Sequence, residues 1–282
     1  LPWGHLLNEF TDPGDALSMN KLTSPLAGEH LTVGYDKKII IRDLSVAIPA
    51  GEITVIIGPN ACGKSTLLKT LSRLITPVAG KVLLNGKDIK TYPTKETARH
   101  LGLLPQSPTA PAGITVRELV FRGRYPYQTL FNRPDAQDQE AVTRAMQATR
   151  VDHLACQAVD TLSGGQRQRV WIAMVLAQET PLLLLDEPTT WLDITHQIEL
   201  MELMRDLNRQ HGRTLVVVLH ELNHACRYAT HLIAMRDGQI VAQGKPSEIV
   251  TPALIEQVYG LNAMIISDPV AGTPMVIPLG RE

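Results

Sequence analysis

One segment of the sequence has the residue types and spacing of a phosphate-binding loop. It comprises Gly58, Pro59, Asn60, Ala61, Cys62, Gly63, Lys64, Ser65 and Thr66, and it fits the pattern G-x-x-x-x-G-K-[ST]. The two glycines permit backbone angles that a Cβ atom would forbid, so that successive N–H groups can surround phosphate oxygens. We expect Lys64 to reach the β- and γ-phosphates of a nucleotide and Ser65 to hold Mg²⁺. A chance match at an ordinary turn is the alternative, but an apolar run at 53–57 and a helical pattern after the loop favour the nucleotide site.

Two carboxylates follow the apolar run 182–185. An apolar run without alternation fits a strand that is covered on both faces, as in a parallel sheet, and such sheets bind ligands at the carboxyl ends of their strands. We expect Asp186 to orient Mg²⁺ through its water shell and Glu187 to polarise the attacking water as a general base. A lone Asp-Glu pair is usually a solvated turn, but here the pair ends a leucine run in a chain that also has a phosphate-binding loop.

Three further polar or aromatic residues stand at predicted strand ends. Gln106 ends the strand predicted at 101–106, where it could also be an ordinary polar cap. His220 stands at the end of the strand predicted to begin at 213, from which it could reach a γ-phosphate. Tyr35 ends the first predicted strand, where it either stacks on adenine or packs at a sheet edge.

A second anion-binding helix start is predicted at the segment Ser163, Gly164, Gly165 and Gln166, which opens an apolar helical pattern. The chain therefore has two elements suited to phosphate.

The elements that must position these residues are strands and helices of mixed order. Strand patterns occur at 31–35, 39–41, 44–48, 53–57, 81–84, 101–106, 182–187, 213–219, 232–235 and 239–242. Helical patterns occur at 63–74, 116–120, 135–149, 170–177, 196–209 and 252–259. Residues after 260 show an irregular apolar pattern from which no element is predicted.

Composition limits the class of protein. The chain has 282 residues with 27 basic and 28 acidic side chains, and its net charge of -1 provides no global attraction for nucleic acid. Its three cysteines lack metal-ligand spacing and suit a reducing compartment. The most apolar region, 170–185, is interrupted by polar residues and Pro181, so no membrane-spanning segment is expected. Residues 1–18 lack the pattern of a secretory signal, and we expect them to be an upstream or cloning-derived extension.

Taken together, these motifs resemble those of the ATP-binding cassette (ABC) ATPases. The segment 58–66 is similar to their Walker A motif, Gln106 to the Q-loop, 162–166 to the LSGGQ signature and 182–187 to the Walker B motif with its catalytic glutamate. Leu192 and Asp193 resemble the D-loop, His220 the switch histidine and Tyr35 the aromatic A-loop.

The resemblance implies a fold and a division of the chain. The expected fold is the α/β fold of P-loop NTPases, with an antiparallel β subdomain and an inserted helical subdomain at about 107–165. The resemblance covers 28–250, which leaves an N-terminal extension at 1–27, expected to be disordered or cloning-derived, and a C-terminal extension at 251–282.

It also implies a mechanism. ATP with Mg²⁺ would lie between two copies of the chain, arranged head to tail, with Ser163, Gly164, Gly165, Gln166 and Asp193 of one copy completing the site of the other. Glu187, His220, Gln106 and Lys64 would be catalytic, and Ser65, Gln106 and Asp186 would hold the metal.

Less specific segments resemble those of the ferric-siderophore importers. They include 71–74, 104–108, 122–126 and 190–193. This resemblance implies an ATPase at the cytoplasmic face of the cell membrane, bound to permease subunits and served indirectly by an external siderophore-binding protein. Importers of haem, cobalamin or another metal chelate remain an alternative. An ATPase acting on DNA or the ribosome is disfavoured, because the chain lacks the insertions or second cassette of those proteins.

Two residues of the loop carry further hypotheses. Many relatives have glycine at the position of Ala61, and alanine is strained there if the position requires a positive φ. Cys62 lies beside a helix N-terminus and Lys64, which predicts a thiol with a lowered pKa that reacts readily with alkylating agents.

Overall fold

The computed structural model describes residues 24–35, 38–128 and 135–280. The N-terminal extension expected at 1–27 therefore lies outside the described residues, except for 24–27. Leu26 and Ala27 of this segment belong to the first strand, where both side chains are buried.

A six-stranded sheet forms the centre of the molecule, in the order β10-β9-β3-β8-β7-β6. Its strands are β3 (Ile53–Ile57), β6 (Leu101–Leu104), β7 (Leu182–Asp186), β8 (Thr214–Val218), β9 (His231–Arg236) and β10 (Gln239–Gly244). All neighbouring pairs are parallel except β10 with β9. Because parallel neighbours end at the same edge, the segments that follow β3, β6, β7 and β8 meet there.

The uninterrupted apolar runs in this sheet are explained by burial on both faces. In β8, Leu215 and Val217 pack into one core cluster, whereas Val216 and Val218 pack into the other. β3 and β7 divide their side chains in the same way. This confirms the expectation of a parallel sheet drawn from the leucine and valine runs.

A second, antiparallel sheet has the order β2-β1-β4-β5. Its strands are β1 (Leu26–Tyr35), β2 (Lys38–Ile48), β4 (Ala79–Leu84) and β5 (Lys87–Asp88). The two strands predicted at 39–41 and 44–48 are one strand, β2. Asp43 in its middle has a φ of 50°, and this local kink interrupts the alternation that the sequence pattern follows.

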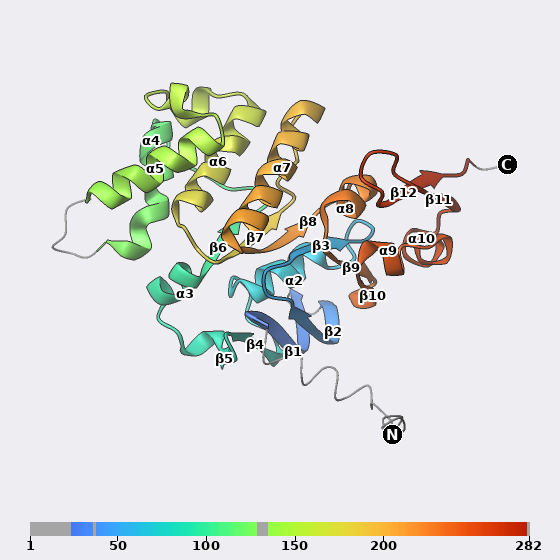
Figure 1. Ribbon diagram of the computed structural model, residues 1–282. Helices are drawn as coiled ribbons and strands as arrows, with labels where there is room; N and C mark the ends of the chain where they lie inside the picture. Colours follow the sequence, from blue (N-terminus) through green and yellow to red (C-terminus); the bar gives the residue numbers. More distant parts are fainter. Residues whose placement is uncertain (1–23, 36–37, 129–134, 281–282) are drawn as a thin grey trace, which may run out of the picture.

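Helices cover the central sheet and form a separate group. They are α2 (Lys64–Leu71), α3 (Thr94–His100), α4 (Val116–Phe121), α5 (Ala136–Ala148), α6 (Gly164–Ala177), α7 (Ile194–His211), α8 (Leu222–Tyr228), α9 (Pro246–Ile249) and α10 (Pro252–Tyr259). Helices α4, α5 and α6 pack against one another at one side of the molecule, away from the antiparallel sheet (Figure 1). The model thus has the α/β core, the antiparallel sheet and the helical unit that the sequence predicts.

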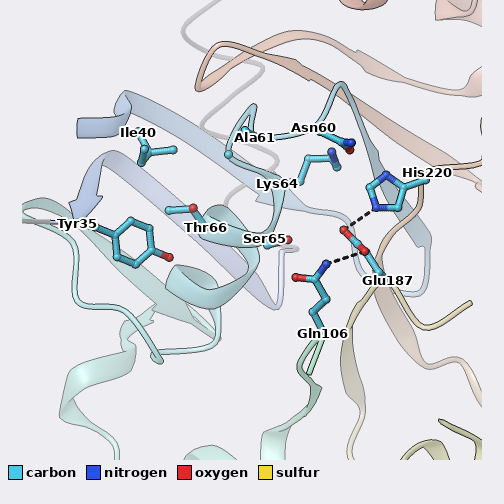
Figure 2. A pocket seen from close by; sticks show the side chains of 11 residues that line it. Tyr35, Ile40, Asn60, Ala61, Lys64, Ser65, Thr66, Gln106, Glu187 and His220 are labelled. Carbon is cyan, nitrogen blue, oxygen red and sulfur yellow. Dashed lines mark hydrogen bonds and ion pairs between the residues drawn. The ribbon is translucent and has the colours of Figure 1, made fainter. Parts of the chain in front are cut away.

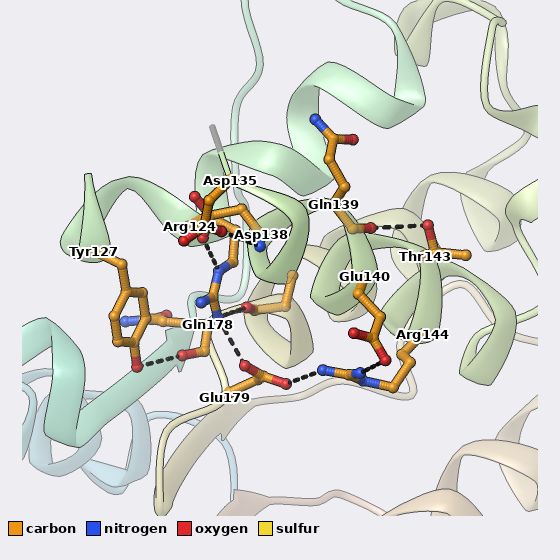
Figure 3. A network of polar contacts seen from close by, with 11 residues as sticks. Arg124, Tyr127, Asp135, Asp138, Gln139, Glu140, Thr143, Arg144, Gln178 and Glu179 are labelled. Atoms are coloured by element: carbon orange, nitrogen blue, oxygen red, sulfur yellow. Dashed lines mark hydrogen bonds and ion pairs between the residues drawn. The ribbon is translucent and has the colours of Figure 1, made fainter. Parts of the chain in front are cut away.

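A buried arginine, Arg124, connects the helices of this unit through hydrogen bonds and ion pairs (Figure 3). Arg124 lies in the short helix η2 (Arg122–Tyr127), and its Nε donates to Asp138 Oδ1 of α5 at 2.8 Å. Its Nη1 donates to the carbonyl of Ala177 at the end of α6 and to Glu179 Oε2, both at 2.9 Å. Gly123 has to be glycine, because a Cβ atom there would lie 2.2 Å from the carbonyl oxygen of Met174 in α6.

The last described residues form a hairpin of β11 (Ala263–Ser267) and β12 (Pro274–Pro278), where the sequence predicted no element. The hairpin is held by α8. The Asn223 side chain accepts from the N–H of Val276 at 2.8 Å and donates to its carbonyl at 3.3 Å. Arg227 pairs with Asp268, whose side chain is buried.

Among the described helices, none combines the length and apolar character that a membrane crossing requires.

Candidate nucleotide-binding site

The phosphate-binding loop and the strand ends line one cavity of about 740 Å³ (Figure 2). The lining residues are Tyr35, Ile40, Asn60, Ala61, Gly63, Lys64, Ser65, Thr66, Gln106, Glu187 and His220. All except Ile40 belong to the site predicted from the sequence. They come from the antiparallel sheet, from the loop after β3, from the start of α2, and from the segments after β6, β7 and β8.

The loop has the backbone conformation that its glycines permit. Gly58 has a φ of 152° and Gly63 a φ of 106°. A Cβ atom at Gly58 would lie 2.2 Å from the carbonyl oxygen of Met235 and 2.8 Å from Cys62 Sγ, so only glycine fits. Ala61 has a φ of 62°, so this alanine adopts the left-handed conformation that disfavours a Cβ atom by about 1 kcal/mol.

Lys64 is buried and turned into the loop. Its Nζ donates to the carbonyl of Gly58 at 2.8 Å and to that of Pro59 at 2.9 Å. An ammonium group has three donors, so one remains for a ligand. Lys64 is also the first residue of α2, whose N-terminus adds positive potential to the same place.

Ser65 and Asp186 form a pair suited to a divalent cation. The Ser65 hydroxyl donates to Asp186 Oδ1 at 2.8 Å, and Asp186 Oδ2 is buried without a hydrogen-bond partner. Burial raises the pKa of the Asp186 carboxyl, and the neighbouring charge of Glu187 raises it further. A bound cation would offset both the desolvation of the Asp186 carboxylate and its repulsion by Glu187. Hydroxyl and carboxylate oxygens are ligands that Mg²⁺ accepts, so these residues fit the metal.

The described residues contain no group of three or more His, Cys, Asp or Glu side chains that could hold a metal by itself. A metal in this site would therefore need further ligands, and the phosphates of a nucleotide are suitable ones.

Glu187 brings two of the other predicted residues together (Figure 2). Gln106 Nε2 donates to Glu187 Oε2 at 2.8 Å, and His220 Nε2 lies 2.6 Å from Glu187 Oε1. The Glu187 side chain is only 10% exposed, and its backbone has a φ of 52°. This left-handed conformation turns the carboxylate from the end of β7 toward the neighbouring strand ends.

Tyr35 and Ile40 form the apolar side of the cavity. Tyr35 ends β1 and is 48% exposed, whereas Ile40 follows in β2. Sequence reasoning missed Ile40, because only the pairing of β1 with β2 places it beside the phosphate-binding loop. The nearby Tyr35 was the one signal that pointed to this hairpin.

Cys62 corrects one prediction. Its side chain is 4% exposed, packs into the core beneath the loop and does not line the cavity. Burial raises the pKa of its thiol, and this outweighs the lowering effect of Lys64. The expectation of an activated thiol was therefore wrong, because it counted the positive charges and not the loss of hydration. Only the backbone of Cys62 remains a candidate for phosphate contact.

The signature residues and Asp193 do not line this cavity. Ser163 caps α6: its hydroxyl accepts from the N–H of Gln166 at 3.3 Å, and Gln166 Oε1 accepts from the N–H of Ser163 at 3.0 Å. Asp193 caps α7 by accepting from the N–H of His196 at 2.9 Å. A single chain therefore leaves these two predicted elements apart from the phosphate-binding loop.

Comparison with known proteins places this geometry in a family. Residues 41–190 match the model of the family described as ABC transporter. The chain is 65% identical to the ferric enterobactin transport ATP-binding protein FepC of Escherichia coli (strain K12) over 93% of this chain and 97% of that protein. It is 52% identical to the achromobactin transport ATP-binding protein CbrD of Dickeya dadantii (strain 3937), over 91% of this chain and 96% of that protein.

Solved structures agree with these relatives. An ABC transporter in an inward-facing conformation contains a chain that matches with a TM-score of 0.77 at 27% identity, over 92% of this chain and 98% of that chain. The dimeric bacterial ABC transporter cassette MJ0796 matches with a TM-score of 0.71 at 26% identity, over 78% and 98%. The chain therefore belongs to the ABC transporter family, as an ATP-binding subunit of the kind that couples ATP hydrolysis to transport.

Proposed function

We propose that this protein is the ATP-hydrolysing subunit of an importer of ferric siderophores. The observation that carries the proposal is the 65% identity to the ferric enterobactin protein of Escherichia coli over nearly its whole length. CbrD, at 52%, is also named for the transport of a siderophore, achromobactin. Cobalamin import proteins of Halobacterium salinarum are more distant, at 39% identity.

In this proposal one wall of the cavity contacts the adenine base of the nucleotide and the opposite wall contacts its phosphates. The Tyr35 ring and Ile40 offer an apolar surface to the adenine base. The N–H groups of 58–66, the free donor of Lys64 and the start of α2 surround the phosphates. Ser65 and Asp186 would hold Mg²⁺, with Gln106 as a further ligand, and the cation would supply charge stabilisation to the terminal phosphates.

Glu187 is the proposed general base, and its present contacts define a requirement for activity. Glu187 Oε2 accepts a hydrogen bond from Gln106, and Oε1 is in contact with His220 Nε2. A carboxylate has about four acceptor sites, so Glu187 can still accept a water molecule, but the contacts with Gln106 and His220 restrict where that water can approach. A terminal phosphate near His220 offers Nε2 a competing acceptor, so that substrate arrival would release Glu187 at the moment when it is needed.

A second copy of the chain is the proposed source of the signature residues. Trp191 and Ile194 on either side of Asp193 are 78% and 76% exposed, and Gly164 lies against Trp191. A homodimer arranged head to tail would cover these apolar side chains. It would also bring Ser163, Gly164, Gly165 and Gln166 of each copy to the phosphates bound by the other, so that ATP joins the two copies.

The other proposed partners are those that an importer ATPase requires. The ATPase would lie at the cytoplasmic face of the membrane, bound to permease subunits, and an external siderophore-binding protein would deliver the cargo on the other side. Movement at Gln106 and in the helical unit would pass to the permease.

The test is rescue of an Escherichia coli strain that lacks FepC. We expect this chain to restore growth on ferric enterobactin as the sole iron source, and the Glu187→Gln variant to fail at equal expression. If the wild-type chain is expressed and hydrolyses ATP but does not rescue, while it restores cobalamin-dependent growth in a strain that lacks the corresponding ATPase, the siderophore assignment is wrong.

A further inference from the structure

A second cavity lies between α7, the end of α8 and the turn of the C-terminal hairpin, with the first residue of β3 at its wall. Its volume is about 380 Å³, which is within the range of small-molecule sites. Its lining residues are Ile53, Glu202, Arg205, Asn208, Arg209, Arg227, Tyr228, Ala229, Thr230, Val270, Ala271 and Thr273. None of them lines the nucleotide cavity.

The side chains that line this cavity carry more positive than negative charge. Three arginines and one glutamate line the cavity. Arg227 is neutralised by Asp268, which accepts from its Nε at 2.9 Å. Glu202 is occupied by Arg205 and by the Tyr228 hydroxyl, which donates to it at 2.9 Å. Arg209 has no carboxylate partner among the described residues, so the wall keeps a positive charge.

Two donors near this charge also lack acceptors. Arg205 Nε and Thr273 Oγ1 are both buried from water and have no hydrogen-bond partner. Buried polar groups are nearly always paired, because each unpaired group costs about 1–3 kcal/mol. They come from different parts of the fold, α7 and the hairpin turn, yet both belong to residues that line the same cavity. A ligand with acceptor oxygens would satisfy both of them once small rotations of the Arg205 and Thr273 side chains turn these donors toward the cavity.

We propose that this cavity binds a small organic anion that carries a phosphate or carboxylate group. Arg209 supplies the charge, and Arg205 Nε and Thr273 Oγ1 supply hydrogen bonds to the anionic oxygens. Ile53, Val270 and Ala271 are apolar lining residues of the same cavity and suit the carbon skeleton of the ligand. The inference does not depend on the cargo of the transporter, because the lining residues belong to the ATPase subunit alone.

The experiment is calorimetric titration of the full chain with glycerol 3-phosphate and, separately, with citrate. At least one probe should bind at one site per chain, and the probe that binds identifies the anionic group. Arg209→Gln should weaken this binding about tenfold or more, because it removes a charged donor. Arg42→Gln is the matched control, since Arg42 is also exposed and has no carboxylate partner among the described residues but lies in β2. It should bind as wild type does.

Two more variants separate this site from the phosphate-binding loop and from unfolding. Lys64→Ala should leave binding of the probe intact, and Thr273→Val should weaken it while the thermal midpoint stays near that of wild type. The proposal is overturned if neither probe binds at millimolar concentration, or if Lys64→Ala abolishes binding that Arg209→Gln and Thr273→Val preserve. Equal weakening by Arg209→Gln and Arg42→Gln would overturn it as well.

Discussion

His220 Nε2 lies 2.6 Å from Glu187 Oε1, although the two residues are separated by a helix and a strand in the sequence. They meet because β7 and β8 are parallel neighbours, with Asp186 opposite Val218. Each strand therefore ends at the same edge of the sheet, and Glu187, directly after β7, lines the same cavity as His220, two residues after β8. This contact places the proposed general base under the control of a residue that can also face a phosphate.

Replacing Glu187 with glutamine should separate ATP binding from hydrolysis. The amide keeps the size of the side chain but cannot take a proton from water, so steady-state phosphate release should fall by about a hundredfold or more. ATP affinity, measured by titration, should stay within a few-fold of wild type. Glu221→Gln is the control, because Glu221 is exposed and lies next to His220. Near wild-type turnover in Glu187→Gln would remove Glu187 from the role of base.

The parts of this site that the sequence predicts are those that depend on local pattern. Leucine and valine runs mark β7 and β8 as buried strands, and the polar residue after each run then lies at a strand end by geometry alone. The glycines of the phosphate-binding loop specify their own backbone conformation. For these residues the order along the chain and the rule for parallel sheets suffice.

The parts that were missed depend on contacts between distant segments. Ile40 joins the cavity only through the pairing of β1 with β2. The C-terminal hairpin has an exposed face and is held by Asn223 and Arg227 of α8, which no local pattern of 263–278 reveals. The direction of the Cys62 pKa was predicted wrongly because the depth of burial beneath the loop is a tertiary property.

Tyr35 should contribute to ATP affinity through its ring. Stacking of an aromatic side chain on a base contributes about 1–3 kcal/mol, so Tyr35→Ala should weaken ATP binding by about fivefold or more. Tyr35→Phe keeps the ring and should bind ATP nearly as wild type does. Titration of both variants with ATP decides the matter. If Tyr35→Phe weakens ATP binding as much as Tyr35→Ala does, the hydroxyl group and not the ring contributes the affinity.

Asp186→Asn should stabilise the protein without nucleotide and abolish its activity. Burial disfavours the Asp186 carboxylate, and Asp186 Oδ2 has no hydrogen-bond partner. An amide removes the charge yet can still accept from Ser65, so we expect a gain of about 1 kcal/mol, or about 2–4 °C in thermal midpoint. Hydrolysis that depends on Mg²⁺ should be lost. A lower midpoint in the absence of metal would contradict this account of the site.

The raised pKa of Asp186 also predicts the effect of pH on this group. Because the pKa is higher in the folded protein than in the unfolded chain, the unfolded chain loses its proton first as the pH rises. The contribution of Asp186 to stability therefore falls as the pH rises through the interval between the two pKa values and stays constant above it. Unfolding of wild type and Asp186→Asn should thus differ less at acid pH than at neutral pH when metal is absent.

The three cysteines should differ sharply in reactivity. Burial raises the pKa of the Cys62 thiol, and it raises that of Cys226 to about 11, whereas Cys156 is exposed. Iodoacetamide at pH 8 should therefore modify Cys156 first, and the other two only when the protein unfolds. Mass spectrometry of proteolytic fragments over time measures this order. Rapid modification of Cys62 in folded protein would restore the hypothesis of an activated thiol.

Arg124 should contribute far more to stability than Arg144, although both bind Glu179 (Figure 3). The Arg124 side chain is 7% exposed and that of its partner Asp138 is 10% exposed, whereas Arg144 is 54% exposed. Arg124→Met would leave the Asp138 carboxylate buried and without its cation, which typically costs about 3–5 kcal/mol. Arg144→Met removes two solvent-exposed ion pairs, with Glu140 and with Glu179, and should cost much less because water screens both. Urea unfolding of the two variants provides the comparison, and equal losses would show that the burial of the ion pair does not determine its contribution.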